Sequence, residues 1–227
     1  MKILKFCCKI VSLYKLTTFL YNKTMHYKEE KILSIARIHN GHFFSKMADE
    51  YGIERRFIKQ LMDSNHLIKV CSATYCLPNT SLDYYYIFSY FHKQAVFDLR
   101  ASLMLHGMFY ENNEPIEIAL PRGSNTSRYD KDKYIVQTRL PLYYKSGIIS
   151  VCSFSNHEVL TYNLPMTYVH LLLSVKYKDT SWLKISVNEY IKKNGVEPIY
   201  QQAILIRKKE SIEKQLKKRG CNEKVNF

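Results

Sequence analysis

The feature that most constrains the fold is the segment of residues 51–78, in which a glycine, an amphipathic helix and a short hairpin follow one another. At about 100° per residue, the apolar side chains of Ile53, Phe57, Ile58 and Leu61 fall within an arc of about 140°. This arc is expected to be buried, with the opposite arc facing outward. The outward arc carries long cationic and amide side chains together with one carboxylate: Arg55, Arg56, Lys59, Gln60 and Asp63.

The neighbouring sequence places this helix in a small domain. Two helices are expected before it, over residues 26–38 and 45–51, with Asn40-Gly41 and Gly52 at their ends. After it, residues 67–70 and 75–77 are expected to form two strands around a turn at residues 72–74. Three helices followed by a hairpin are typical of a winged helix-turn-helix, so residues 25–80 are predicted to form such a domain.

The rest of the chain predicts a second domain with a sheet, and the fold class is therefore α+β. Residues 81–205 are expected to form a mixed α/β domain with a small antiparallel or mixed sheet and a helical C-terminal region. Residues 206–227 are predicted to be a basic helical tail. The expected elements are helices over 81–94 and 95–108, strands at 115–121 and 134–141, a hairpin of 147–154 with 158–165, and helices from 166 onward.

The first 24 residues differ from the rest of the chain. They lack the uninterrupted apolar core and cleavage site of a secretory signal, and Lys5, Lys9 and Lys15 interrupt any membrane span. Two interpretations stay open: a basic amphipathic helix lying on a membrane, or a poorly ordered leader upstream of a true start at Met25. No integral membrane association is expected. The six cysteines form no C-x-x-C framework, which favours a reducing, cytoplasmic location.

Net charge favours a polyanionic partner. The chain has a formal charge of +14, concentrated at its ends: residues 1–24 hold five Lys or Arg and no acid, and residues 161–227 hold thirteen against six acids. The predicted winged domain is more balanced, with eight cations against six acids in residues 25–80.

No catalytic, cofactor or metal motif occurs. The glycine-rich phosphate-binding motifs, G-x-S-x-G and H-E-x-x-H are all missing from the sequence, so we expect neither an enzyme nor a cofactor. A weaker alternative is a nucleic-acid enzyme whose site combines Asp130, Asp132 and His106. Cys71 and Cys76, with His39, His42 and His66 near them in sequence, match no standard zinc spacing, and no metal site is predicted.

DNA binding is the function for which the sequence offers suitable side chains. In a helix-turn-helix the second helix lies in the major groove, where Arg can bridge guanine acceptors and Gln can pair with adenine. This interpretation requires a protruding helix whose guanidinium groups are not held in ion pairs. The alternative is a protein-interaction module with the same fold. The predicted base contacts are Arg55, Arg56, Lys59 and Gln60, and the predicted backbone or minor-groove contacts are Lys69, Ser72 and Thr74 of the hairpin.

Several blocks of the sequence resemble one protein family. Residues 52–78 resemble the "glycine, helix, leucine, loop, tyrosine" pattern of the N-terminal winged helix in AbiEi-type antitoxins of type IV toxin-antitoxin systems. Residues 95–123 resemble the second block of that family, a helix with a Ser and a Leu-His-Gly turn that leads into a strand beginning with Pro. Residues 147–177 and 188–193 occupy the places of its later strand and helix, and the resemblance extends over about residues 27–203.

The resemblance implies an antitoxin that binds operator DNA, represses its own operon and antagonises an AbiEii-type nucleotidyltransferase toxin without stable contact. The alternative is a winged-helix transcriptional regulator or interaction module without antitoxin activity. One departure concerns the second domain. Where the family has Glu-Arg-Thr followed by an Asp, this chain has Pro165-Met166-Thr167 and His170, and only the threonine is retained.

Overall fold

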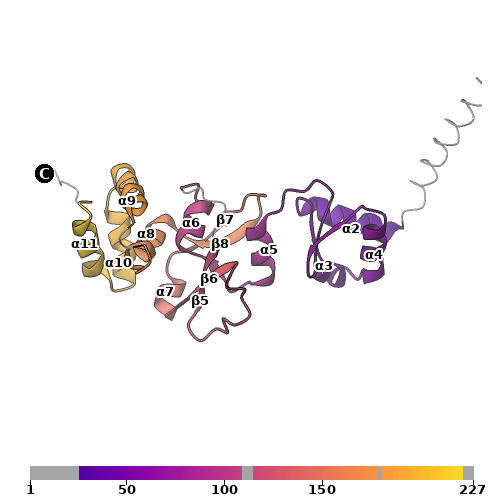
Figure 1. The fold of residues 1–227 in the computed structure, drawn as a ribbon, viewed down its shortest axis with the longest axis horizontal. Helices are drawn as coiled ribbons and strands as arrows, with labels where there is room; N and C mark the ends of the chain where they lie inside the picture. Colours follow the sequence, from indigo (N-terminus) through magenta and orange to yellow (C-terminus); the bar gives the residue numbers. More distant parts are fainter. Residues whose placement is uncertain (1–25, 109–114, 178–179, 222–227) are drawn as a thin grey trace, which may run out of the picture. The chain divides into compact units, whose positions relative to one another are not determined.

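The computed structural model describes residues 26–108, 115–177 and 180–221. The predicted leader, residues 1–24, lies outside the described residues. The chain divides into two compact units, residues 1–82 and 83–227, which are described separately below. The fold is α+β, with one sheet of three strands and another of five (Figure 1), so the predicted fold class is confirmed at this level.

Within residues 26–82, the first unit combines three helices with a small antiparallel sheet of strand order β1-β3-β2. The sheet includes residues 42–44, which the sequence indicated only as an extended link. These residues pair with β3 and contribute the fully buried Phe43 and Phe44 to the core. The elements are α2 (Tyr27–Ile38), β1 (His42–Phe44), α3 (Ser45–Glu50), α4 (Arg55–Asp63), β2 (Ile68–Cys71) and β3 (Thr74–Cys76).

A helix cap and a glycine turn determine where α2 begins and how the chain continues into β1. His26 and Glu29 form a capping box at the start of α2, which satisfies backbone N–H groups that the first turn leaves free. Gly41, with φ of 89°, turns the chain from α2 into β1. A Cβ at that position would lie 2.2 Å from Thr80 Oγ1, so glycine is needed for the turn and for the close approach of residue 80.

The second unit is built around a five-stranded mixed sheet of order β6-β5-β4-β8-β7. β5 and β6 are parallel, β7 and β8 form the predicted antiparallel hairpin, and the two-residue strand β4 joins these pairs at the centre. The elements are α5 (Tyr84–Phe91), β4 (Val96–Phe97), α6 (Leu99–Leu105), β5 (Ile116–Pro121), β6 (Tyr134–Arg139), α7 (Pro141–Lys145), β7 (Ile148–Cys152), β8 (Glu158–Tyr162), α8 (Leu164–Leu173), α9 (Ser181–Asn194), α10 (Glu197–Leu205) and α11 (Lys209–Lys218).

Successive side chains of a strand point to opposite faces of a sheet, and a separate apolar cluster covers each face of this one. Along β5, Ile118 and Leu120 join one apolar cluster with Tyr85 and Phe88 of α5. Ala119, between them, joins a second cluster made mainly by the C-terminal helices.

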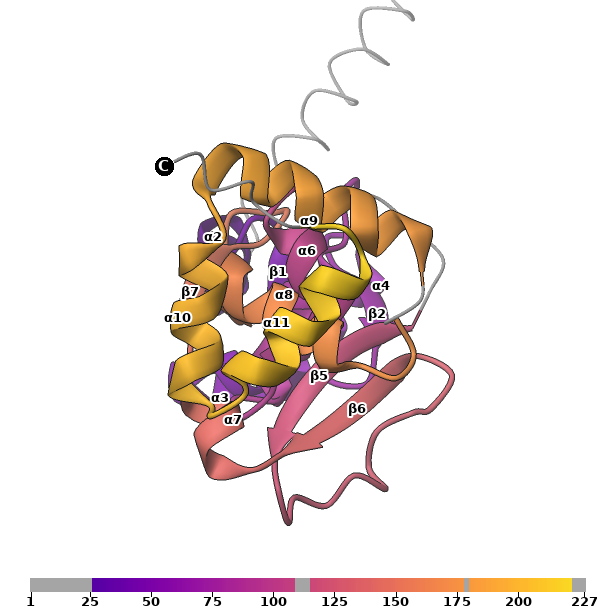
Figure 2. The same cartoon turned by 90° about the vertical axis from the view of Figure 1, so that its left-hand side faces the viewer.

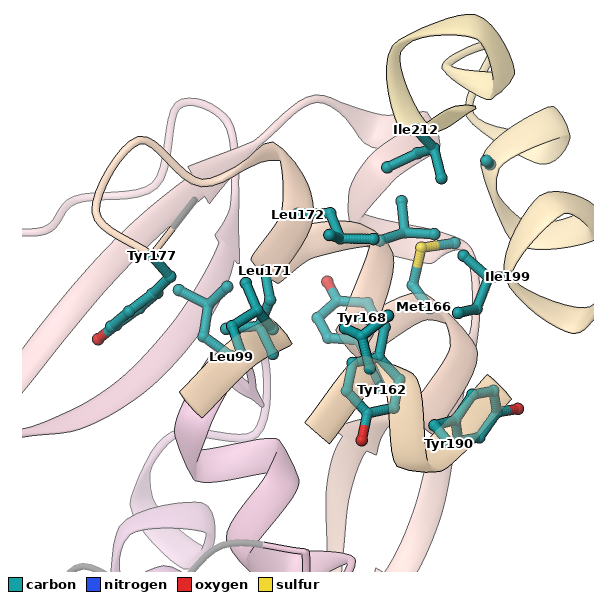
Figure 3. Packing of buried hydrophobic residues seen from close by; sticks show 14 of the residues in the cluster. Leu99, Tyr162, Met166, Tyr168, Leu171, Leu172, Tyr177, Tyr190, Ile199 and Ile212 are labelled. Carbon is teal, nitrogen blue, oxygen red and sulfur yellow. The ribbon is translucent and has the colours of Figure 1, made fainter. Parts of the chain in front are cut away.

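The second cluster is the larger core, and α8 lies at its centre. Figure 2 shows α9, α10 and α11 around α8, and α10 and α11 both pack against it. Seven consecutive residues of α8, from Met166 to Leu172, are buried. Figure 3 shows side chains of α8 directed toward Ile199 of α10 and Ile212 of α11.

The structure differs from the sequence predictions at several places in the second unit, including the following. The helix expected over residues 95–108 begins only at Leu99, because Val96 and Phe97 form β4. The helix expected at the end of the chain is broken at Arg207, which has φ of 57°, into α10 and α11. Residues 209–218 are not a separate tail, since Ile212 and Leu216 are buried in the larger core. Among the described helices, none is long and apolar enough to cross a membrane.

Candidate functional site

The polar face of α4 is the candidate site in the first unit. Phe57, Ile58 and Leu61 are each no more than 4% exposed, which confirms the predicted buried arc. Gly52, with φ of 63°, lies in the turn that leads from α3 toward α4. The opposite side of α4 is exposed to solvent at Arg55, Arg56, Lys59 and Gln60, as the arc of the helix predicted.

The two guanidinium groups of this face are held in ion pairs, contrary to the expectation that they would be free. Arg55 Nη2 lies 2.8 Å from Asp49 Oδ2, and Arg56 Nε lies 2.7 Å from Glu54 Oε2. A hydrogen bond from Arg55 lowers the pKa of Asp49, and a hydrogen bond from Lys28 is the main cause of the lowered pKa of Glu54. Both arginine side chains are still 69% exposed, so the pairs are open to water.

Lys59 and Gln60 are in a different state. Neither side chain has a hydrogen-bond or ion-pair partner within the described parts of the first unit, and both are exposed. They therefore present donors, and in Gln60 also an acceptor, to solvent on the same face as the paired guanidinium groups.

The hairpin presents two of its three predicted contact residues. Lys69 and Ser72 are exposed. Thr74 is fully buried, and its hydroxyl donates to the Ser72 carbonyl at 3.3 Å, so the prediction that Thr74 contacts DNA is wrong. The turn consists of Ser72 and Ala73 alone, and Thr74 is already the first residue of β3, with its side chain directed into the core. The Ala73 carbonyl accepts from Ser45 N–H at 2.9 Å, which ties the hairpin tip to the start of α3.

The residues of the weaker enzyme hypothesis have structural partners. His106 Nε2 donates to the Tyr162 carbonyl at 2.8 Å. Asp130 accepts from the backbone N–H of Asp132 at 3.0 Å and lies 3.4 Å from Lys133 Nζ. In the chain that the structure covers, no group of three or more His, Cys, Asp or Glu side chains could hold a metal ion. Cys71 is exposed and Cys76 is buried, and both are free thiols.

The second unit contains a buried charged cluster that the sequence did not indicate. The Asp98 carboxylate is completely buried and accepts from Leu99 N–H at 2.8 Å, from Arg139 Nε at 2.7 Å and from His170 Nδ1 at 2.9 Å. Arg139 Nη2 also pairs with it. Burial alone would raise the pKa of the Asp98 carboxyl, but Arg139 and His170 outweigh burial and hold that pKa well below its usual range.

His170 is neutral in this cluster. Burial lowers the pKa of its imidazole, and the attraction of Asp98 does not compensate. With Asp98 ionised, the Nδ1 of His170 carries the proton and donates it to the carboxylate.

A second buried carboxylate belongs to Glu117, whose backbone carbonyl accepts from Asp98 N–H at 3.0 Å. Glu117 is 1% exposed and accepts from Arg100 N–H at 2.9 Å, from Lys176 Nζ at 3.4 Å and from the Tyr177 hydroxyl. Arg100 Nε lies 3.5 Å from the same carboxylate. The two buried carboxylates are thus both paired with cations, Asp98 with Arg139 and Glu117 with Arg100 and Lys176.

Comparisons with known proteins assign neither site. No family model matches the chain, and no curated protein matches it. Function is therefore inferred from the geometry and chemistry of the described residues.

Proposed function

We propose that residues 26–82 form a winged helix-turn-helix that binds double-stranded DNA through α4 and the β2–β3 hairpin. The order of elements supports this proposal: a helix, a strand, two helices joined around Gly52, and two strands that close an antiparallel sheet with the first. α4 is the second helix of the α3–α4 pair, which is the recognition helix in this motif.

The observation that carries the proposal is the division of α4 into two faces. One face is buried through Phe57, Ile58 and Leu61, and the other exposes four side chains capable of reaching base edges or phosphates. Lys59 and Gln60 are available without breaking another contact. Lys69 and Ser72 on the hairpin supply contacts to the phosphate backbone beside the groove.

The ion pairs of Arg55 and Arg56 do not meet the requirement for free guanidinium groups, so this function depends on DNA displacing both carboxylates. DNA acceptors have to replace the carboxylates of Asp49 and Glu54, and exposed pairs of this kind exchange readily because water and salt screen them. The same carboxylates reduce the positive potential of the face. We therefore expect moderate affinity that falls steeply as salt rises.

The resemblance to AbiEi-type antitoxins supports a wider role for the whole chain, in which the first unit represses its own operon in the cytoplasm and the second antagonises a nucleotidyltransferase toxin. The charged Glu, Arg and Asp of the family correspond to Pro165, Met166 and His170 in this chain, and both Met166 and His170 are buried in α8. Toxin antagonism in this chain would therefore use other residues of the second unit.

The proposal is tested by fluorescence anisotropy of the full chain with a labelled duplex from upstream of its own reading frame. Replacing both Arg55 and Arg56 with Ala is expected to weaken binding about tenfold or more, since each Arg can make a bidentate base contact. The matched control is Arg37→Ala, an exposed arginine on α2 that is also ion-paired, at 2.8 Å from Glu30. Equal losses in both variants, or no loss in either, contradict a specific role for α4.

A double variant is expected to change the affinity for DNA in the opposite direction. Asp49→Asn combined with Glu54→Gln releases both guanidinium groups and removes two negative charges from the face. Tighter DNA binding with a steeper salt dependence is expected. The alternative, a protein-interaction module, is favoured by the ion pairs and by the near balance of eight cations and six acids in residues 25–80. Unchanged binding in the Asn/Gln variant, with weak and salt-insensitive DNA affinity throughout, favours that alternative.

A further inference from the structure

The second unit contains a cleft of about 620 Å³ that the proposed DNA-binding function does not use. Its walls come from the start of α6, the end of β6, α7, the end of α8 with the segment that follows it, and the residue before α11. This volume lies within the range of about 300–1,000 Å³ that is usual for small-molecule sites.

Part of the lining of this cleft is cationic. Arg139, Lys176 and Lys208 line it, and no carboxylate does. Arg139 binds Asp98 through Nε and Nη2, which leaves its Nη1 without a partner in the described residues. Lys208 is exposed and likewise unpaired within that part of the chain.

The two buried carboxylates behind the cleft do not cancel this charge. Asp98 is matched by Arg139, and Glu117 is shared by Arg100 and Lys176. Together with Lys208, four cations stand against two carboxylates, and the neutral His170 adds no charge. A concave surface with this excess concentrates an anion.

Another part of the lining is apolar and aromatic. Leu99, Tyr143, Leu173 and Val175 contribute to it, and Val175 is 81% exposed. Leu99 has φ of 51°, a conformation that costs a leucine free energy and that is found more often at functional sites. The Asp98 carboxylate stabilises this conformation by accepting from Leu99 N–H.

We propose that this cleft binds a nucleoside phosphate, with the phosphate held by Arg139, Lys176 and Lys208 and the base or sugar lying on Tyr143 and the neighbouring apolar side chains. The polar side chains of Gln137 and Ser174 also line the cleft and provide donors and acceptors for ligand hydroxyl or amino groups. An inorganic anion would use only the cationic lining residues. A nucleoside phosphate has an anionic part and a ring part, and it would use both the cationic and the apolar lining residues.

The experiment is isothermal titration calorimetry of the full chain with AMP, ATP, adenosine and inorganic phosphate. Saturable binding of AMP or ATP is expected, tighter than that of adenosine or phosphate. Lys208→Glu is expected to weaken nucleotide binding about tenfold or more, because it removes a charge-assisted contact and adds a repulsive charge. Lys193→Glu is the control, since Lys193 is exposed near the end of α9 and does not line the cleft.

Three results would overturn the proposal. The first is no saturable binding of any nucleotide at concentrations up to about 1 mM. The second is an equal loss in the Lys208→Glu and Lys193→Glu variants, which would indicate general attraction to a basic protein. The third is phosphate binding as tight as AMP binding, which would show that the nucleoside part of the ligand contributes nothing to binding. Circular dichroism of both variants establishes that each is folded, and the DNA-binding assay with Arg55 and Arg56 variants is independent of all three results.

Discussion

Replacing Asp98 with Asn is expected to destabilise the second unit severely. The carboxylate is completely buried, and four donors converge on it: the Leu99 N–H, two nitrogens of Arg139 and the Nδ1 of His170. An asparagine keeps the shape of the side chain. It removes the charge, however, and it turns one of the two acceptor atoms into an NH2 group that faces other donors.

The size of the expected loss of stability follows from the charge that remains on Arg139. Arg139 is only 15% exposed at its side chain, so without Asp98 its guanidinium becomes a largely buried charge without a counter-charge. Removing one partner of a buried ion pair costs about 3–5 kcal/mol. Against a total stability of about 5–15 kcal/mol for an ordinary domain, this loss is a large fraction.

Urea unfolding is the appropriate measurement, followed by tryptophan fluorescence. Trp182 is the single tryptophan of the chain, and its ring lies 5.6 Å from that of Tyr177, so its emission reports on the second unit. Asp130→Asn is the control: Asp130 is 48% exposed at its side chain and paired with Lys133 on the surface. A change within about 0.5 kcal/mol is expected for the control.

A double variant separates the ion pair from the general effect of mutating a core residue. Because Arg139→Met alone leaves Asp98 without its cation, and Asp98→Asn alone leaves Arg139 without its anion, the double variant should lose less stability than the two single variants summed. The reasoning is refuted if Asp98→Asn costs less than about 1 kcal/mol, or if the two changes are additive.

Three further outcomes are expected. Burial lowers the pKa of His170 below its ordinary 6.5, so the unfolded chain binds a proton that the folded chain does not. Stability should therefore fall as the pH drops below about 6.5, by at most about 1.4 kcal/mol per pH unit for this group, and His170→Gln should flatten the urea-unfolding profile in that range. Gly41→Ala should cost about 1–3 kcal/mol in thermal unfolding, because of its φ of 89° and the contact with Thr80, and an unchanged unfolding temperature would contradict the role given to this turn. Lys69→Ala should reduce the salt slope of DNA binding by about 1, whereas Thr74→Val should leave DNA affinity unchanged; the opposite order would show that the hairpin has been assigned wrongly.

Local patterns predicted the elements whose signal lies within a few residues. The two faces of α4 follow from the spacing of Phe57, Ile58 and Leu61, and the β7–β8 hairpin follows from two alternating runs around a turn. Val96 and Phe97 were expected in a helix because they begin an apolar run. Their pairing with Ala119, Ile118 and Thr161, far along the chain, makes them a strand instead.

The candidate site could be predicted only in part, because a local pattern shows which side chains are exposed but not which residues of other elements pair with them. Exposure of Arg55 and Arg56 could be read from the helix arc, whereas their partners lie outside α4: Asp49 across the Gly52 turn, and Glu54 at the N-cap. Thr74 was misplaced because the turn is one residue shorter than expected, and a shift of one residue reverses the face of a strand side chain. Asp98 and His170 are 72 residues apart, and no local pattern brings them together.

The five-stranded sheet has only two residues at its centre. Phe97 pairs with Ile118 on one side and with Thr161 on the other, and the Thr161 hydroxyl adds a 3.0 Å hydrogen bond to the Phe97 carbonyl. The outer strands are longer and end in loops, where an inserted residue can be absorbed without changing the pairing inside. One residue inserted between Ala95 and Asp98 would displace the alignment with β5 and with β8 at the same time. We therefore expect insertions and deletions among related sequences to be rarest in this short stretch.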